Sequence, residues 1–164
     1  VGGVGRVAGL LAGVANVPVL TPSIPADRAR CARAVHDHWT APMWLARAWR
    51  PLVERRDEAG IVFAVDVPGR VGRAYWGGYG VAQHGLRGLI ASLHDELGRT
   101  PVRVSGLYPG PLRPALRARA YSVDQDPAAQ GPEKAAAAAV ALLSAAGAPW
   151  RGQVLDASHT TVAS

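Results

Sequence analysis

The segment GRVGRAYWGGYGVAQHGLRG, residues 69–88, constrains the fold more than any other part of the chain. Glycines crowd the start of a helix there, at positions 72, 77, 78 and 80. Glycine lets a backbone approach a ligand or another backbone closely, and it tolerates strained turns. The following helix has one apolar face, whose members recur at helical spacing: Leu86, Leu89, Ile90, Leu93 and Leu97. The sequence therefore predicts an amphipathic helix whose glycine-rich start lies against a ligand or another backbone.

Tyr79 and Gln83 form the only constellation in the sequence that is typical of chemistry. They lie one helical turn apart, so their side chains leave the helix on the same side. A tyrosine at the N-terminus of a helix and a polar residue one turn later form a candidate proton-transfer pair. An aromatic side chain that merely packs at a helix start has the same spacing. The residues alone leave both interpretations open.

Short apolar runs predict the strands of a sheet. Residues 61–65 and 102–107 are predicted as buried strands, and residues 7–14 as an earlier one. The last strand is expected to end near Ala157. Before it, Pro132 and Glu133 open an alanine-rich helix, in which proline occupies a tolerated first-turn position.

A long, tryptophan-rich helix is predicted from Asp27, a good capping residue, to about Val53. Pro42 and Pro51 are expected to break or kink it locally. Its tryptophans, Trp39, Trp44 and Trp49, recur every five residues and therefore point to different sides. Such a helix is expected to be buried between neighbours, either as ordinary core or at an interface between chains.

The composition fits one folded domain and argues against several classes of protein. Of 164 residues, 49% are apolar and 18% charged, which favours a globule over a disordered tail. The net charge of +6 comes mainly from scattered arginines, so we expect no nucleic-acid binding. The single cysteine, Cys31, excludes an internal disulfide and a zinc knuckle and fits a reducing, cytoplasmic compartment; no metal site is predicted.

Neither a membrane segment nor a phosphate loop is predicted. The longest apolar tract, residues 135–146, is shorter than the roughly 20 residues that span a bilayer, and no secretory signal pattern is present. Residues 3–8, GVGRVA, fit the dinucleotide fingerprint literally. That motif needs a strand leading into it, and only Val1 and Gly2 precede it. The first residue is not methionine, which is consistent with a piece of a longer product.

The segment from Tyr79 to Gln83 resembles the Tyr-x-x-x-Lys signature of the short-chain dehydrogenases/reductases (SDRs), with glutamine in place of the lysine. Three further segments are similar to the fifth strand, the sixth strand with its Pro-Gly turn, and the last strand of that family: GIVFAVD at 60–66, RVSGLYPG at 103–110 and RGQVLD at 151–156. The resemblance covers nearly the whole chain.

This resemblance implies an α/β fold, a partial Rossmann-like doubly wound parallel sheet. Residues 1–164 would form a single domain equivalent to about the second half of an SDR domain, without the N-terminal dinucleotide-binding strands. A βαβ unit takes about 30 residues, and nothing before Val7 can hold one. The family's fourth strand then becomes a sheet edge, which invites pairing with another chain. We therefore expect a homo-oligomer, such as the family's four-helix dimer, or a chain that completes the sheet.

The resemblance also implies an activity, NAD- or NADP-dependent interconversion of a small-molecule carbonyl and an alcohol, and the residues for it. Tyr79 would be the acid/base and Gln83 a residual ribose contact. Asp66 stands at the family's serine position and His38, as nearly as it can be placed, at its asparagine position. Pro109 and Gly110 would border the cofactor, and Pro114 replaces a threonine.

The replacements at positions 83 and 66 both weaken the implied chemistry, and His38, which could relay a proton, cannot restore it alone. A tyrosine titrates near 10, so without an adjacent cation its phenolate is scarce at neutral pH. A carboxylate at position 66 is expected to raise the tyrosine pKa further and to oppose a developing oxyanion. The sequence thus predicts either a weak or inactive SDR-like enzyme or a non-catalytic interaction protein that keeps the fold.

Overall fold

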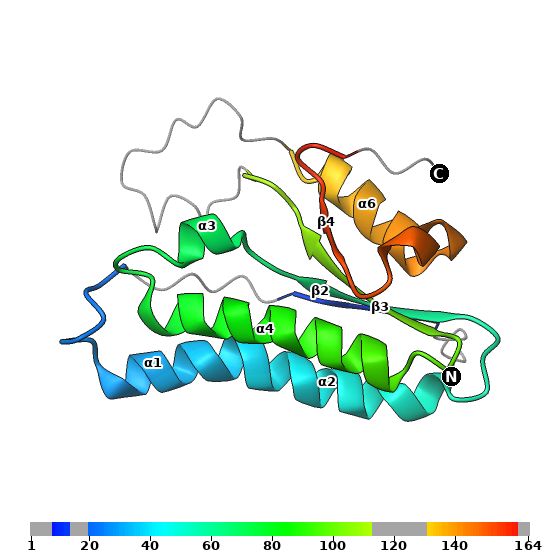
Figure 1. The fold of residues 1–164 in the computed structure, drawn as a ribbon, viewed down its shortest axis with the longest axis horizontal. Coiled ribbons are helices and arrows are strands. Elements are labelled where there is room, and N and C mark those ends of the chain that lie inside the picture. Colours follow the sequence, from blue (N-terminus) through cyan, green and yellow to red (C-terminus); the bar gives the residue numbers. More distant parts are fainter. Residues whose placement is uncertain (1–7, 14–19, 113–130, 161–164) are drawn as a thin grey trace, which may run out of the picture.

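The computed structural model describes residues 8–13, 20–112 and 131–160. Four parallel strands make its sheet, in the order β1-β2-β3-β4 (Figure 1). They are β1 (Gly9–Ala12), β2 (Ala59–Ala64), β3 (Val102–Tyr108) and β4 (Val154–Asp156). The predicted α/β class and parallel sheet are confirmed.

Strands β2 and β3 form the buried centre of the sheet. All residues of β3 are buried, as are the first five of β2, as expected of parallel strands covered on both faces. Phe63 packs among residues of α2 and α4, whereas its neighbour Val62 joins the cluster around the alanine-rich helix. Successive side chains therefore serve opposite faces of the sheet.

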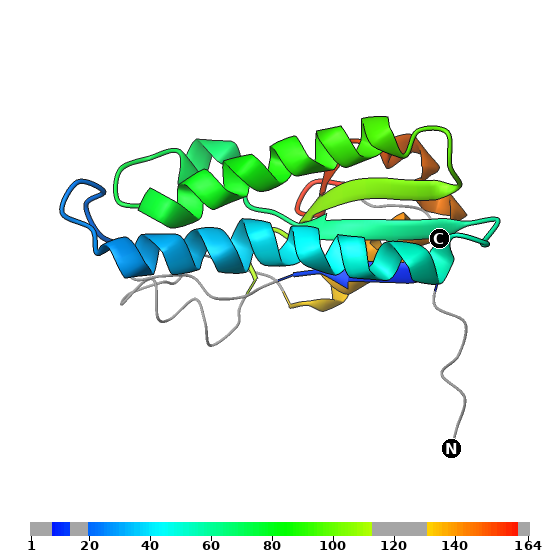
Figure 2. The same ribbon diagram turned by 90° about the horizontal axis from the view of Figure 1, so that it is seen from below.

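A helical layer built from two segments covers one face (Figures 1 and 2). The first segment runs through α1 (Arg28–Val35), a π-helical turn η1 (His36–Thr40), α2 (Ala41–Trp49) and a 3₁₀ turn η2 (Arg50–Val53). The second is α4 (Gly77–Glu96), which lies beside it and is preceded by the short helix α3 (Pro68–Val71). The predicted helix of residues 27–53 and the predicted apolar face of α4 are both confirmed.

Capping and proline placement explain the first segment. The Asp27 side chain accepts a hydrogen bond from the Arg30 backbone N–H at 2.8 Å, which satisfies one free donor of the first turn. Pro42 lies in the first turn of α2, and Pro51 in the first turn of η2. Each proline thus lies where the helix type changes. The first turn of a helix tolerates proline, because the backbone N–H that proline lacks would have no partner within the helix there.

The tryptophans of this segment differ in burial. Trp49 is 5% exposed and belongs to the core, whereas Trp44 is 51% exposed. The interpretation of these tryptophans as ordinary core therefore holds for Trp49 but not for Trp44. One side carries exposed apolar residues: Trp44, Leu45 and Leu52.

The opposite face of the sheet is covered by α6 (Glu133–Leu143) and the 3₁₀ segment η3 (Ala145–Trp150). Ala138 and Ala139 are buried against Val62 and Leu155, which shows why an alanine-rich helix suits this position: its small side chains allow close packing on the sheet. The predicted start of this helix at Pro132 and Glu133 is confirmed.

Strand β1 forms one edge of the described sheet. It pairs with β2 alone, and its Leu11 is 49% exposed. This agrees with the edge position expected for the first strand. Residues 1–7 and 14–19, which include most of the GVGRVA motif, lie outside the described residues. Within the described part of the chain, no helix is both long and apolar enough to cross a membrane.

Candidate active site

Glycines at the start of α4 bring three helices together at the site. A Cβ on Gly80 would lie 2.2 Å from the Val71 carbonyl oxygen of α3, and one on Gly78 would lie 2.9 Å from the Cys31 carbonyl oxygen of α1. No side chain fits at either distance. The glycine-rich start of α4 was predicted to lie against a ligand or another backbone, and the structure shows the contact with other backbone.

Asp66 is the hub of a buried polar network just beyond the carboxyl end of β2. Its carboxylate accepts from Arg70 through Nε at 3.0 Å and through Nη2 at 2.6 Å to each oxygen. The Val67 N–H donates to Oδ1 at 2.6 Å, and the Tyr79 hydroxyl donates to Oδ2 at 3.2 Å. Asp66 is only 6% exposed, and both oxygens of its carboxylate accept hydrogen bonds.

The backbone of Asp66 is also fixed, by two residues of α4. Its N–H donates to Gln83 Oε1 at 2.9 Å. Its carbonyl oxygen accepts from Arg87 Nη2 at 2.9 Å and from Arg87 Nε at 3.3 Å. Burial lowers the pKa of Arg87, and attraction to the Asp66 carboxylate partly opposes that shift.

Tyr79, at the start of α4, packs against two aromatic neighbours. The His38 ring, from the π-helical turn, meets it edge-on with centroids 4.7 Å apart, and the Trp76 ring lies 5.6 Å away. Tyr79 is 7% exposed and His38 3%. The structure therefore brings together the four residues predicted as catalytic, Tyr79, Gln83, Asp66 and His38.

Two arginines of this network were missed by the sequence analysis. Arg70 forms an ion pair with the Asp66 carboxylate, a partner that the sequence analysis did not predict when it placed this carboxylate beside Tyr79. Its spacing, four residues after Asp66, was the available signal, since Arg–Asp pairs at that distance meet when the chain turns helically. Arg87, 21 residues away from Asp66, gave no such signal.

The predicted cofactor-bordering turn lies at the carboxyl end of β3. Gly110 has φ +82°, which favours glycine, and a Cβ there would come within 3.1 Å of the Ser158 side chain. The backbone N–H of Val65, next to Asp66, donates to the Leu107 carbonyl at 2.9 Å, so Pro109 and Gly110 follow a strand end close to the hub. Pro114 lies outside the described residues.

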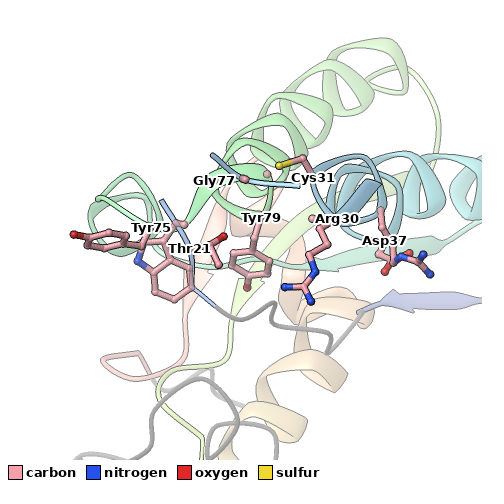
Figure 3. A pocket seen from close by; sticks show the side chains of 12 residues that line it. Thr21, Arg30, Cys31, Asp37, Tyr75, Gly77 and Tyr79 are labelled. Carbon is pink, nitrogen blue, oxygen red and sulfur yellow. The ribbon is translucent and has the colours of Figure 1, made fainter. Parts of the chain in front are cut away.

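A pocket of about 390 Å³ opens beside Tyr79, between α1 and the start of α4 (Figure 3). This volume lies within the range of roughly 300–1,000 Å³ typical of small-molecule sites. Its charged lining residues are Arg30, Arg33 and Asp37, all from the first helical segment. Among the described residues, no group of three or more His, Cys, Asp or Glu side chains could hold a metal ion.

The model of the short chain dehydrogenase family matches residues 2–124, more than half of the chain. The chain belongs to the short chain dehydrogenase family. Escherichia coli K12 YciK, described as an uncharacterized oxidoreductase, is 31% identical over 117 residues, which cover 71% of this chain and 44% of YciK.

Solved structures of this family resemble the fold closely. A Pseudomonas syringae short chain dehydrogenase matches with a TM-score of 0.85 and 34% identity, over 93% of this chain and 62% of that one. An Escherichia coli CFT073 short chain dehydrogenase complexed with NADPH matches with a TM-score of 0.84 and 26% identity, over 93% of this chain and 63% of that one. The chain thus spans less than two thirds of the length of each of these relatives.

Within this short chain dehydrogenase, the departures from the Tyr-x-x-x-Lys pattern depend on one another. Gln83, at the lysine position, accepts a hydrogen bond from the backbone of Asp66, at the serine position. Asp66 in turn accepts the Tyr79 hydroxyl. A lysine at position 83 could not accept a hydrogen bond from the Asp66 backbone N–H, because its ammonium group only donates.

Proposed function

We propose that this chain carries the tyrosine-bearing part of an NAD(P)-dependent SDR oxidoreductase site and is weak or inactive in hydride transfer. The observation that supports this most directly is the hydrogen bond from the Tyr79 hydroxyl to Asp66 Oδ2. A phenol has one proton, so a hydroxyl that donates to a carboxylate is not donating to a substrate carbonyl.

The charges around the hydroxyl support the same proposal. An oxyanion that develops beside Tyr79 would face the Asp66 carboxylate, which is the opposite of a stabilising donor. Arg70 balances that carboxylate with three contacts, and the side chain at the lysine position is neutral. Both arginines at this site donate to Asp66, Arg70 to its carboxylate and Arg87 to its backbone carbonyl oxygen.

The described residues do not fit a tightly held nicotinamide ribose. The family cofactor, NAD or NADP, would supply or accept the hydride. Gln83 Oε1 is already bonded to the backbone of Asp66, which leaves only the neutral amide nitrogen of Gln83 to meet a ribose hydroxyl. The glycine turn at Pro109 and Gly110 remains as a border for the ring. We therefore expect weak binding of NADH and NADPH, although a relative such as the Escherichia coli CFT073 protein is complexed with NADPH.

Steady-state turnover tests the proposal. The 164-residue chain is assayed with NADH and with NADPH on a panel of small ketones, and in reverse on the matching alcohols. We expect kcat at least roughly a thousandfold below the about 10 s⁻¹ of a median enzyme. The double variant Asp66→Ser/Gln83→Lys, checked by circular dichroism, is expected to gain about tenfold or more. Wild-type turnover at ordinary rates would refute the proposal.

A second candidate function is non-catalytic association through α2, which we propose because Trp44, Leu45 and Leu52 are exposed. Exposed apolar groups of this kind mark protein interfaces when they are contiguous. Light scattering after size exclusion tests it: Trp44→Ala should shift an oligomer toward monomer, whereas Val140→Ala, on the opposite face of the sheet, should not. A wild-type chain that is monomeric at all concentrations removes this candidate.

A further inference from the structure

The pocket beside Tyr79 has two unlike walls. One is apolar and aromatic and comes from the start of α4, with the buried rings of Trp76 and Tyr79. The other comes from α1, which contributes Arg30 and Arg33, and its continuation contributes Asp37. Two arginines against one acid leave this wall basic.

Arg30 is the cation placed to meet a ligand. Figure 3 shows its side chain extending beside the Tyr79 ring. Among the described residues, the arginines that form ion pairs are Arg50, Arg70 and Arg103, and no hydrogen bond of the Arg30 side chain is found. A guanidinium fork in this position suits a planar anion such as a carboxylate.

The backbone around the pocket also carries strain. Tyr75, at the outer rim, has φ +77°, a conformation that tyrosine rarely adopts. Its carbonyl oxygen accepts the Thr21 N–H at 3.1 Å, which ties the two sides of the rim together. Figure 3 shows the Tyr75 ring directed away from Tyr79, and the next residue, Trp76, is 7% exposed and lines the pocket. Strained residues of this kind cluster at ligand sites.

Resting on the function proposed above, we infer that the pocket takes small carboxylic acids with an apolar body, bound with the carboxylate on Arg30 and with the carbonyl or alcohol group next to Tyr79. The apolar body would lie against the Trp76 side of the pocket. This class narrows the ligand from any small carbonyl compound or alcohol to 2-oxo and 2-hydroxy acids with a hydrocarbon or aromatic substituent.

Equilibrium binding to the wild-type chain, without cofactor, tests the inference. Calorimetric titrations use mandelate, an aromatic 2-hydroxy acid, and benzoylformate, its 2-oxo counterpart. Methyl mandelate lacks the charge and glycolate lacks the apolar body, so each tests one half of the claim. We expect mandelate to bind with a Kd of about 1 mM or below, and both comparison compounds to bind about tenfold more weakly.

A matched pair of variants assigns the charge. Arg30→Gln should weaken mandelate binding about tenfold. Arg28→Gln removes an exposed arginine of the same helix that does not line the pocket, and it should leave binding unchanged. Both substitutions change the net charge equally, so a difference between them reports a local contact. Thermal unfolding of both variants checks that each is folded.

Several outcomes would overturn the inference. These are equal binding of mandelate and its methyl ester, equal binding of glycolate and mandelate, an Arg30→Gln variant that binds like wild type, or no binding of mandelate at 10 times the expected Kd, about 10 mM. The assay contains no NADH or NADPH, so its failure leaves the proposal about hydride transfer standing. Ordinary turnover with NADPH, by contrast, would refute that proposal without changing the affinity for mandelate.

Discussion

Removing Arg70 tests the network around Asp66 most directly. The Asp66 side chain is 7% exposed and that of Arg70 33%. Loss of one partner from a fully buried pair costs about 3–5 kcal/mol, because the other charge stays buried without compensation. Water reaches the exposed third of Arg70, and Val67 and Tyr79 still donate to the carboxylate, which together reduce that cost by about half. We therefore expect Arg70→Ala to lower the free energy of unfolding by about 2 kcal/mol.

A double-mutant cycle isolates the interaction between the two side chains. Asp66→Asn, Arg70→Ala and the double variant are unfolded in urea and followed by far-ultraviolet circular dichroism, with linear extrapolation to water. The double variant should be more stable than the sum of the single effects predicts, by about 1–2 kcal/mol, because Arg70→Ala no longer strands a charge once Asp66 is neutral.

Arg50→Ala is the matched control for this cycle. Arg50 also pairs with an acid four residues on, Glu54, at 3.0 Å, but the two side chains are 35% and 62% exposed. Such a surface pair is worth about 0.5 kcal/mol. If Arg70→Ala costs no more than Arg50→Ala, or if the cycle is additive within about 0.3 kcal/mol, then Asp66 is not the buried hub inferred here.

Three further predictions concern the same region, and each is tested by urea unfolding. Gly80→Ala should destabilise the fold by about 3 kcal/mol or prevent folding, since the new Cβ meets the Val71 carbonyl oxygen at 2.2 Å. Gly88→Ala is the control, because Gly88 is exposed in the same helix with nothing within 4 Å of a Cβ, and it should stabilise by about 0.5–1 kcal/mol. Equal effects of the two substitutions would contradict the packing of α4 against α3. Tyr75→Gly should raise stability by up to about 1 kcal/mol by relieving the positive φ of +77°, and a clear loss would show that the ring holds the rim. Burial lowers the pKa of Arg87, so its desolvation cost is present at all pH values below that lowered pKa and is relieved only in strong alkali. Arg87→Met should therefore lower the free energy of unfolding by about 1 kcal/mol, by the same amount at all pH values between about 6 and 9. A marked dependence of this difference on pH would contradict the prediction.

Local patterns in the sequence were enough to predict most of the elements. The apolar spacing from Leu86 to Leu97 predicted the buried face of α4, and Asp27 predicted the start of α1, because helical periodicity and capping act within one or two turns. The central strands followed from their apolar runs. The Tyr79 to Gln83 segment, together with the family resemblance, pointed to residues that the structure brings together around Asp66.

The charge balance of that site depended on tertiary structure. Gln83 and Arg87 reach Asp66 from 17 and 21 residues away, and this contact exists only after β2 and α4 have packed on each other. The sequence predicted a carboxylate beside Tyr79 but not its partners, which folding supplies as donors to both the carboxylate and the backbone carbonyl of Asp66. Likewise, five-residue spacing alone could not tell which tryptophan is buried, because that depends on where the sheet lies: Trp49 faces it and Trp44 does not. Sequence thus determined the helices, the strands and the location of the tyrosine, since these depend on short-range periodicity; only the packed structure decided which partners the buried polar groups take, since those partners are distant in the chain.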